Sequence, residues 1–411
     1  MTTPSLYNVQ KIREDFPILQ KNIHGYPLAY LDNAATTQKP LLVLNSVAKF
    51  YEESNANVHR GTHQLAETAT LLYENAREKA KTLINAASVN ECVFVRGTTE
   101  GINLVANGFI HSILKPGDEI IISHIEHHSN IVPWQIACEY TGATLRIIPC
   151  NAKGELLLDE YAKLLNDKTK LVAVTHVSNL LGTINPIAEM VAMAHQHHCP
   201  ILIDGAQAIA HLKVDVQALD CDFYAFSAHK MYGPTGIGVL YGKREWLNRL
   251  PPFQGGGEMI KSVTFEKTIF NDLPLKFEAG TPAFAQAIGL GAAIDYLNAI
   301  GLSNIASHEH SLLEYAMSKL EAVPTIRFIG TAKDKSAIIS FILENIHAHD
   351  VGTVLNQKGI AVRTGKLCAE PTLERFGIQS TVRASFGLYN TEEEIDRLVN
   401  ALIETYHLFN R

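Results

Sequence analysis

Apolar runs rich in β-branched residues alternate with helix-like segments along most of this 411-residue chain. From about Tyr30 onward, the helix-like segments include residues 65–86, 99–113 and 130–140. The apolar runs predict strands at residues 91–95, 119–123, 144–149, 171–175, 200–203 and 221–226. Continuous apolar strands separated by helices are typical of a mostly parallel sheet with both faces covered. The pattern therefore predicts an α/β fold.

The pattern changes after about Ala292, where strands become sparse. A helix is predicted at residues 305–320, a strand at 337–343 and a terminal helix at 391–408. The chain is long enough for two domains. We expect a large domain at residues 26–292 and a smaller α+β domain built from residues 1–25 and 293–411.

Charge and hydropathy disfavour nucleic acid and membranes as binding partners. The net charge of −7 argues against a general nucleic-acid or anionic-membrane surface. No apolar run reaches the roughly 18 residues that a membrane span needs, and residues 1–5 do not resemble the start of a signal peptide. None of the six cysteines forms a C-x-x-C pair, which disfavours a zinc ribbon. We expect a cytoplasmic protein with no nucleic-acid or membrane partner.

Polar residues follow the ends of several predicted strands, which is where ligands bind in parallel sheets. Lys230 comes just after the strand at 221–226, next to Ser227 and His229. A lysine in a desolvated cleft loses its charge readily and becomes a nucleophile for carbonyl groups. A single loop lysine is more often simply solvated. The other motifs therefore decide whether Lys230 is a solvated side chain or a nucleophile.

Two further strand ends carry polar groups. The segment 97–101, Gly-Thr-Thr-Glu-Gly, joins a strand to a helix and would suit an anion such as phosphate, although an ordinary threonine cap also fits. Asp204 ends an apolar strand, where a protonated pyridine nitrogen would be a suitable partner. Gln207 would then bond the phenolic oxygen of the same ring. An Asp-Gly turn is the alternative for Asp204.

The segment 124–128, His-Ile-Glu-His-His, contains residue types that bind zinc. No cysteine or carboxylate set elsewhere completes such a site, so no metal is predicted. An imidazole stacked on a cofactor ring is the preferred interpretation of His127, and a core or capping histidine is the alternative.

Taken together and in order, these motifs resemble a group II cysteine desulfurase of the SufS type. That family consists of fold-type I pyridoxal-phosphate enzymes within the class V aminotransferases. The resemblance covers nearly the whole chain and implies a large domain with a mostly parallel seven-stranded sheet. It rests on residues 95–101, 126–128, 177–179, 204–207, 227–230, 255–257, 277–282 and 363–365 together with Cys368.

The resemblance implies a role for each matching residue. Lys230, Cys368 and His127 would be catalytic, with Lys230 holding pyridoxal 5′-phosphate covalently and Cys368 accepting sulfur. The remaining cofactor contacts would come from Thr98, Thr99, Asp204, Gln207, Ser227, His229 and, from the partner subunit, Thr281. The substrate would contact Asn179, Arg363 and Arg383, and the Arg383 guanidinium would bind the carboxylate of the substrate.

The implied protein is a homodimer that converts L-cysteine to L-alanine and leaves a persulfide on Cys368. A SufE- or SufU-like acceptor would take the sulfur for iron–sulfur cluster assembly. Alternatives are a selenocysteine lyase, a cysteine-sulfinate desulfinase and a catalytically silent scaffold. The family commonly has two histidines before this cysteine, whereas this chain has Lys366 and Leu367. Lys366 would favour a thiolate electrostatically, and Leu367 cannot transfer protons.

Overall fold

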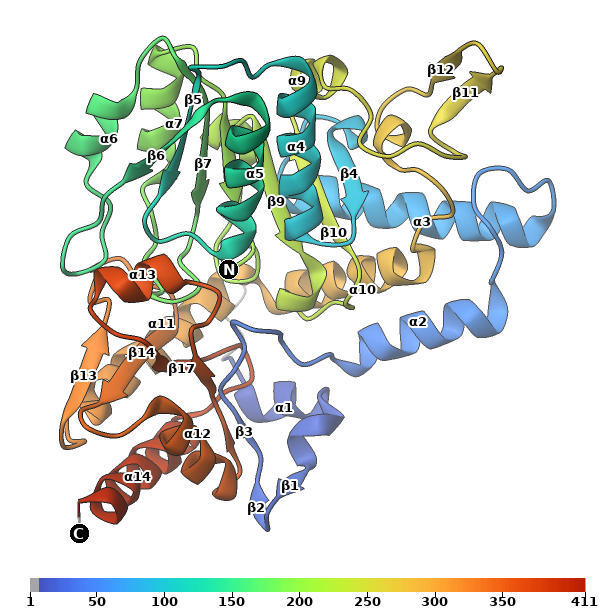
Figure 1. Cartoon of the computed structure of the whole chain (residues 1–411). Coiled ribbons are helices and arrows are strands. Elements are labelled where there is room, and N and C mark those ends of the chain that lie inside the picture. Colours follow the sequence, from blue (N-terminus) through green and yellow to red (C-terminus); the bar gives the residue numbers. More distant parts are fainter. Residues whose placement is uncertain (1–6, 411) are drawn as a thin grey trace, which may run out of the picture.

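A seven-stranded sheet forms the centre of the larger part of the molecule (Figure 1). The computed structural model describes residues 7–410, so residues 1–6 of the predicted smaller domain lie outside the described residues. Strand β10 runs antiparallel to both of its neighbours, and the other pairings in the sheet are parallel. The expected mostly parallel α/β sheet is confirmed. Its strand order is β4 (Cys92–Val95), β10 (Gly238–Gly242), β9 (Phe223–Ser227), β8 (Ile201–Asp204), β7 (Thr169–Thr175), β5 (Glu119–Ser123) and β6 (Thr144–Ile148).

Both faces of this sheet are buried, which explains why its central strands are apolar throughout. In β7, Val172 and Val174 pack on one side, whereas Leu171 and Ala173 pack on the other. The first side is covered by α3 (Gln64–Leu83), α6 (Leu158–Leu164), α7 (Ile187–Gln196) and α10 (Phe284–Ile300). The second side is covered by α4 (Thr98–Ser112), α5 (Val132–Thr141) and α9 (Arg244–Arg249) (Figure 1). The short helix α8 (Val216–Leu219) precedes β9.

A four-stranded antiparallel sheet forms a second layer with its own core. Its strand order is β13 (Ile326–Ile329), β14 (Ile338–Leu343), β17 (Thr381–Ser385) and β16 (Arg363–Gly365). Three helices pack on it: α11 (Leu302–Leu320), α12 (Ala348–Gln357) and α14 (Glu392–Phe409). Helix α13 (Glu370–Arg375) places Leu373 in the core of the larger part instead. Strand β3 (Ala29–Tyr30) pairs in parallel with β15 (Ile360–Ala361), so the N-terminal segment joins this second unit. Helix α10 crosses the predicted boundary after residue 292 without interruption, and the domain division stays a prediction.

The remaining elements lie at the periphery. They are α1 (Val9–Glu14), the hairpin β1 (Asn22–Ile23) and β2 (Tyr26–Pro27), α2 (Leu41–Glu53), and the hairpin β11 (Ile260–Val263) and β12 (Thr268–Phe270). The β11–β12 hairpin extends away from the body of the molecule in Figure 1, and Phe265 at its tip is fully exposed. Among residues 7–410, no helix is both long and apolar enough to cross a membrane.

Candidate active site

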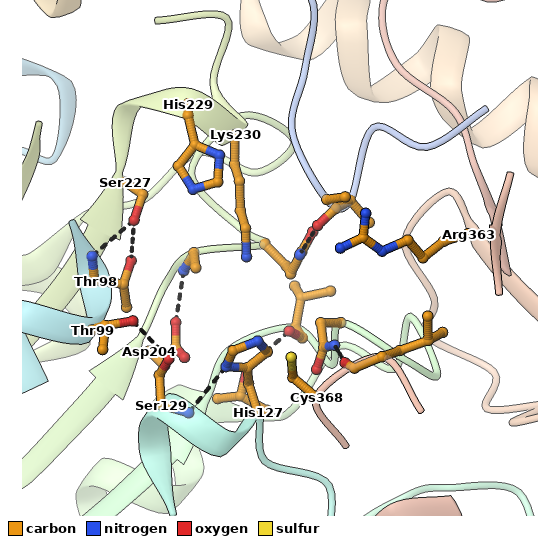
Figure 2. Close-up of a pocket in the computed structure, with 18 of the residues that line it drawn as sticks. Thr98, Thr99, His127, Ser129, Asp204, Ser227, His229, Lys230, Arg363 and Cys368 are labelled. Carbon is orange, nitrogen blue, oxygen red and sulfur yellow. Dashed lines mark hydrogen bonds between the residues drawn. The ribbon is translucent and has the colours of Figure 1, made fainter. Parts of the chain in front are cut away.

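A cavity of about 240 Å³ lies where the carboxyl ends of β4, β5, β7, β8 and β9 meet the second sheet. Figure 2 shows Lys230 extending into the space that His127, Asp204 and Cys368 border. Nearly all of the predicted site residues line this cavity: Thr98, Thr99, His127, Asn179, Asp204, Gln207, Ser227, His229, Lys230, Arg363, Cys368 and Arg383. Thr281 does not, and lines a separate pocket with Arg96 and Phe253. The structure thus brings together residues that lie almost 300 positions apart in sequence.

Hydroxyl groups at the start of α4 form one end of the cavity (Figure 2). Thr98 N donates to Ser227 Oγ at 2.8 Å, and Thr98 Oγ1 lies 2.8 Å from the same oxygen. Thr99 Oγ1 lies 2.7 Å from Ser129 Oγ. Gly97 has no side chain to cap α4, and Ser227 Oγ takes the N–H of Thr98, so among the described residues the N–H groups of Thr99 and Glu100 and the positive end of the helix dipole remain available to an anion. A Cβ atom on Gly97 would lie 3.0 Å from Ser227 Oγ, which explains the glycine.

Asp204 and Lys230 form the charged centre. Asp204 ends β8 with a side chain almost fully buried, and its Oδ1 accepts a hydrogen bond of 2.9 Å from Ala206 N. Burial raises the pKa of the Asp204 carboxyl, an effect that nearby Lys230 opposes. Burial also lowers the pKa of the Lys230 ammonium, which Asp204 opposes and Arg383 reinforces. A lysine that loses its proton readily is suited to act as a nucleophile and a base.

Two imidazoles beside this pair are held neutral. His127 Nδ1 accepts a hydrogen bond of 3.0 Å from Ser129 N, which fixes the orientation of the ring. Burial, reinforced by Lys230, lowers the pKa of His127 to about 3. Burial likewise lowers the pKa of His229 to about 4. Because neither ring is protonated at neutral pH, His127 offers an aromatic face for stacking, and His229 is free to hydrogen-bond as a neutral group.

Two arginines from the second sheet line the opposite end of the cavity. Arg383 is almost fully buried; one of its terminal nitrogens donates to Asn179 O at 2.8 Å and the other to Asp32 Oδ1 at 3.2 Å. Arg363 lies 3.5 Å from Asp32 Oδ2. Within the described residues, Arg383 Nε and Asn179 Oδ1 are buried without a hydrogen-bond partner. Arg363, Arg383 and Asn179 all line the cavity, so two positively charged side chains and an amide are available to a polar ligand at this end.

Cys368 is exposed and lies on the loop between β16 and α13. Its carbonyl oxygen accepts a hydrogen bond of 2.9 Å from His128 N, and Asn179 Nδ2 donates to Leu367 O at 2.9 Å. Leu367 and Cys368 are both left-handed, with φ of 53° and 54°. The Lys366 ammonium group pairs with Glu370 and its side chain does not line the cavity, so an electrostatic effect of Lys366 on Cys368 stays a prediction.

The other cysteines are structural. Cys92, Cys150, Cys199 and Cys221 are buried, and Cys138 is half-buried. Burial raises the pKa of the Cys92 and Cys199 thiols to about 12, so they stay protonated and unreactive. Cys368 is therefore the cysteine placed to react with a bound ligand.

Sequence reasoning missed three polar residues around the site: Ser129, Glu126 and Asp32. Ser129 bonds both Thr99 and His127. Glu126 is completely buried one residue before His127. Glu126 lies within the segment 124–128 and Ser129 directly follows it, but the three histidines carry the stronger signal there. For Asp32, no local signal indicates a contact with arginines more than 300 residues away.

These residues fit pyridoxal 5′-phosphate, the cofactor implied by the resemblance. The start of α4 with the Ser227 and Thr98 hydroxyls suits a phosphate dianion. Asp204 has a buried carboxylate that a pyridinium nitrogen would complement, and Lys230 is an amine for covalent attachment. Gln207 lines the same cavity, although its Nε2 donates here to Ala34 O at 2.7 Å.

Comparison with known proteins agrees with this chemistry. The family described as aminotransferase class-V matches residues 29–398. A cysteine desulfurase of Escherichia coli (strain K12) is 52% identical over 404 residues, which covers 98% of this chain and 99% of that protein. A cysteine desulfurase of Synechococcus elongatus is 52% identical over 396 residues and 96% of this chain, but the match spans only 63% of that longer protein.

Structural comparison points the same way. The crystal structure of the Escherichia coli cysteine desulfurase CsdA, in an S-sulfonic acid form, superposes with a TM-score of 0.92 at 40% identity. The superposition covers 98% of this chain and all of that chain. The chain therefore belongs to the aminotransferase class-V family of pyridoxal-phosphate enzymes and, within it, to the cysteine desulfurases.

Proposed function

We propose that this protein converts L-cysteine to L-alanine and leaves the sulfur as a persulfide on Cys368. The observation that carries this proposal is one cavity that holds Lys230, Asp204, Arg383 and the exposed Cys368 together. A lysine and an aspartate suit a pyridoxal cofactor, and a thiol at the same cavity suits removal of sulfur from a bound substrate.

Each residue contributes a distinct step. Arg383 lines the cavity and binds the substrate carboxylate with its guanidinium group, and Asn179 contacts the substrate at the same end. The bound cofactor supplies an electron sink for carbanion chemistry. Lys230, whose pKa is lowered by burial, takes the proton from the substrate α-carbon.

The Cys368 thiolate then attacks the substrate sulfur. An S–S bond forms as the C–S bond breaks, the electron pair of the broken bond stays on the carbon side, and that side takes up a proton. The balance is one L-cysteine and one Cys368 thiol converted to one L-alanine and one Cys368 persulfide. The exposure of Cys368 supports a direct transfer of this sulfur to an acceptor protein.

The wider setting belongs to the same proposal. We infer a cytoplasmic homodimer that passes sulfur to a SufE- or SufU-like acceptor for iron–sulfur cluster assembly. Two features support a dimer: Thr281 lies outside the cavity of its own chain, and the β11–β12 hairpin exposes apolar side chains including Phe265. The short, hydrogen-bonded Cys368 loop supports an acceptor that comes to the enzyme.

The decisive experiment compares Lys230→Ala and Cys368→Ala with the wild-type enzyme. Alanine formed from L-cysteine is measured, and persulfide on Cys368 is detected by mass spectrometry. We expect Lys230→Ala to lose all turnover and the covalent cofactor seen after borohydride reduction. Cys368→Ala should retain the covalent cofactor but release little alanine, because no thiol is left to take the sulfur.

L-Cysteine sulfinate provides the matched control, since its sulfur leaves without attack by an enzyme thiol. Continued release of alanine from the sulfinate by Cys368→Ala would show an intact site. Alanine production from L-cysteine at the wild-type rate by Cys368→Ala would disprove the role assigned to Cys368.

A further inference from the structure

Several hydrogen-bond donors hold the peptide group between His229 and Lys230. Four donors from residues 36–39 converge on the His229 carbonyl oxygen. Thr37 N lies 3.0 Å from this oxygen, Thr36 Oγ1 lies 3.0 Å away, and Thr37 Oγ1 and Lys39 Nζ each lie 3.1 Å away. A carbonyl oxygen has two lone pairs. The four contacts therefore fix this oxygen more firmly than its own hydrogen bonding requires.

Lys39 gives the one charge-assisted contact among the four. Its ammonium group also donates to Thr37 O and lies 3.4 Å from Thr36 Oγ1, so all three of its acceptors are uncharged groups. Burial lowers the pKa of Lys39 to about 8, and the group is therefore still mostly charged at pH 7. Because hydrogen bonds from charged donors are stronger than those from neutral donors, Lys39 contributes most to holding the His229 oxygen.

The same segment forms part of the cavity wall. Residues 34–39 lie between β3 and α2, and Ala34 and Ala35 line the cavity. Lys230 extends into this cavity from the residue that follows His229 (Figure 2). A shift of the peptide group between His229 and Lys230 would therefore move the Lys230 amine relative to a ligand held against this wall.

We propose that Lys39 is a positioning residue that, together with Thr36 and Thr37, fixes the backbone of Lys230. It would thereby place the Lys230 amine for covalent attachment of the cofactor and for removal of the substrate α-proton. The inference rests on the proposed function in one respect, because that function assigns the proton transfer to Lys230. Lys39 lies outside the cavity lining, so it acts through Lys230 and not on a ligand.

The first test follows covalent attachment of pyridoxal 5′-phosphate to the apoprotein at saturating cofactor, trapped with borohydride and located on Lys230 by mass spectrometry. Lys39→Met removes the ammonium group and keeps the length of the side chain. We expect attachment to slow about tenfold, less than the roughly hundredfold loss that a 1 Å misplacement causes, because Thr36 and Thr37 still bind the carbonyl oxygen. Lys39→Arg keeps the charge and should recover most of the rate.

The second test uses L-alanine, which involves no sulfur chemistry. Exchange of its α-proton in deuterium oxide is followed by NMR in the holoenzyme, per mole of bound cofactor, and its affinity is measured by calorimetry. Lys39→Met should lower the exchange rate at saturating L-alanine about tenfold. It should change the affinity much less, because the arginine end of the cavity is untouched.

Lys276→Met is the matched control. Lys276 also donates to backbone carbonyls, those of Leu247, Asn248 and Leu250, but lies outside the cavity lining. This variant should exchange the α-proton at the wild-type rate. A loss of exchange that is equal in Lys39→Met and Lys276→Met, or that is matched by an equal loss of affinity, would show a merely structural role and overturn the proposal. Wild-type rates of attachment and exchange in Lys39→Met would also overturn it.

Thr36→Val provides a second variant if Lys39→Met fails to fold, since it removes an uncharged donor to the same oxygen. It should slow attachment and exchange by a smaller factor, and wild-type rates would then decide against the proposal. A failure of the proposed function would look different. Wild-type enzyme that exchanges no α-proton would disprove the role of Lys230 as the base, and the attachment rates of the apoprotein variants would then judge the positioning of Lys230.

Discussion

Glu126 shows how a single buried residue organises the floor of the site. Its carboxylate accepts hydrogen bonds from Asn130 Nδ2 at 2.7 Å and Thr175 N at 3.0 Å, and a further one from Ser123 Oγ. These donors come from the ends of β5 and β7 and from the 3-10 helix η3 (His128–Asn130) that follows His127. Burial has the largest effect on the pKa of Glu126 and raises it to about 8, although these hydrogen bonds lower it. The nearby charge of Asp204 also raises it, by a smaller amount.

The raised pKa predicts a pH-dependent stability. The pKa in the folded protein lies above the ordinary value of 4.5, so the stabilising contribution of Glu126 is complete below pH 4.5 and is lost as the pH rises through about 8. Glu126→Gln removes this titration. The free energy of unfolding of the wild type, relative to that of Glu126→Gln, should fall by up to about 1.4 kcal/mol for each pH unit in this window.

Denaturant unfolding of both proteins across that pH range measures the difference. Glu67→Gln changes an exposed glutamate and serves as the control, with a curve parallel to that of the wild type. Parallel curves for the wild type and Glu126→Gln would show that Glu126 ionises normally in the folded protein.

Position along the chain predicted the residues at the strand ends of the cavity better than the residues that support them. Lys230, Asp204 and His127 each follow an apolar strand, and a parallel sheet places such positions at one edge. Asp32 has no comparable signal, because its role depends on two arginines that reach it only through the second sheet. Supporting contacts between distant segments need the tertiary structure.

Under the proposed function, sulfur transfer depends on the loop that carries Cys368. Two consecutive non-glycine residues in the left-handed region are unfavourable, at a cost of about 1 kcal/mol each or more. Three hydrogen bonds offset this cost: His128 N to Cys368 O, Asn179 Nδ2 to Leu367 O, and Ala369 N to Lys366 O. The loop is therefore held in one shape, which keeps the thiol at the cavity.

Lys366 should contribute little to the reactivity of Cys368. Its side chain is 64% exposed and pairs with Glu370, so its charge is screened and partly neutralised. We expect Lys366→Ala to change the rate of Cys368 alkylation by less than about fivefold at any pH, as exposed ion pairs contribute under about 1 kcal/mol. Iodoacetamide labelling across a pH series measures this, with Glu370→Ala as the paired control. A large fall in the alkylation rate in Lys366→Ala, but not in Glu370→Ala, would show that the Lys366 charge does stabilise the Cys368 thiolate.

Strand prediction succeeded where strands are buried on both faces, and it failed where strands are short or lack a continuous apolar run. Strands β4, β5, β6, β7, β8, β9 and β14 fall at the predicted positions to within two or three residues. Strand β10 was missed because it is bounded by Gly238 and Gly242, and β16 because Arg-Thr-Gly has no apolar pattern. The register that sets Arg363 opposite Arg383 depends on β16 pairing with β17, which no local pattern indicates.

At the scale of the whole molecule, a second hollow adjoins the end of the cavity formed by the start of α4. A neighbouring hollow of about 520 Å³ is lined by Thr98, Thr99 and Ser227 together with Arg96 and Phe253. The pocket that contains Thr281 shares Arg96 and Phe253 with this hollow. Thr281 is exposed and stands just beyond the phosphate end of its own chain, a position that suits a contribution to a partner subunit.

A mixed dimer tests whether Thr281 acts across subunits. Loss of one donor to a phosphate dianion costs about 1.5–3 kcal/mol, so Thr281→Ala should retain the cofactor poorly, and Lys230→Ala should be inactive. When Thr281→Ala and Lys230→Ala chains are combined, the site with an intact Lys230 would receive an intact Thr281 from its partner. Alanine formation at limiting cofactor should therefore reappear in the heterodimer, at about half the wild-type level because one of its two sites is restored. If Thr281 serves its own chain, no site in the heterodimer has both residues, and the activity stays at the level of the separate variants.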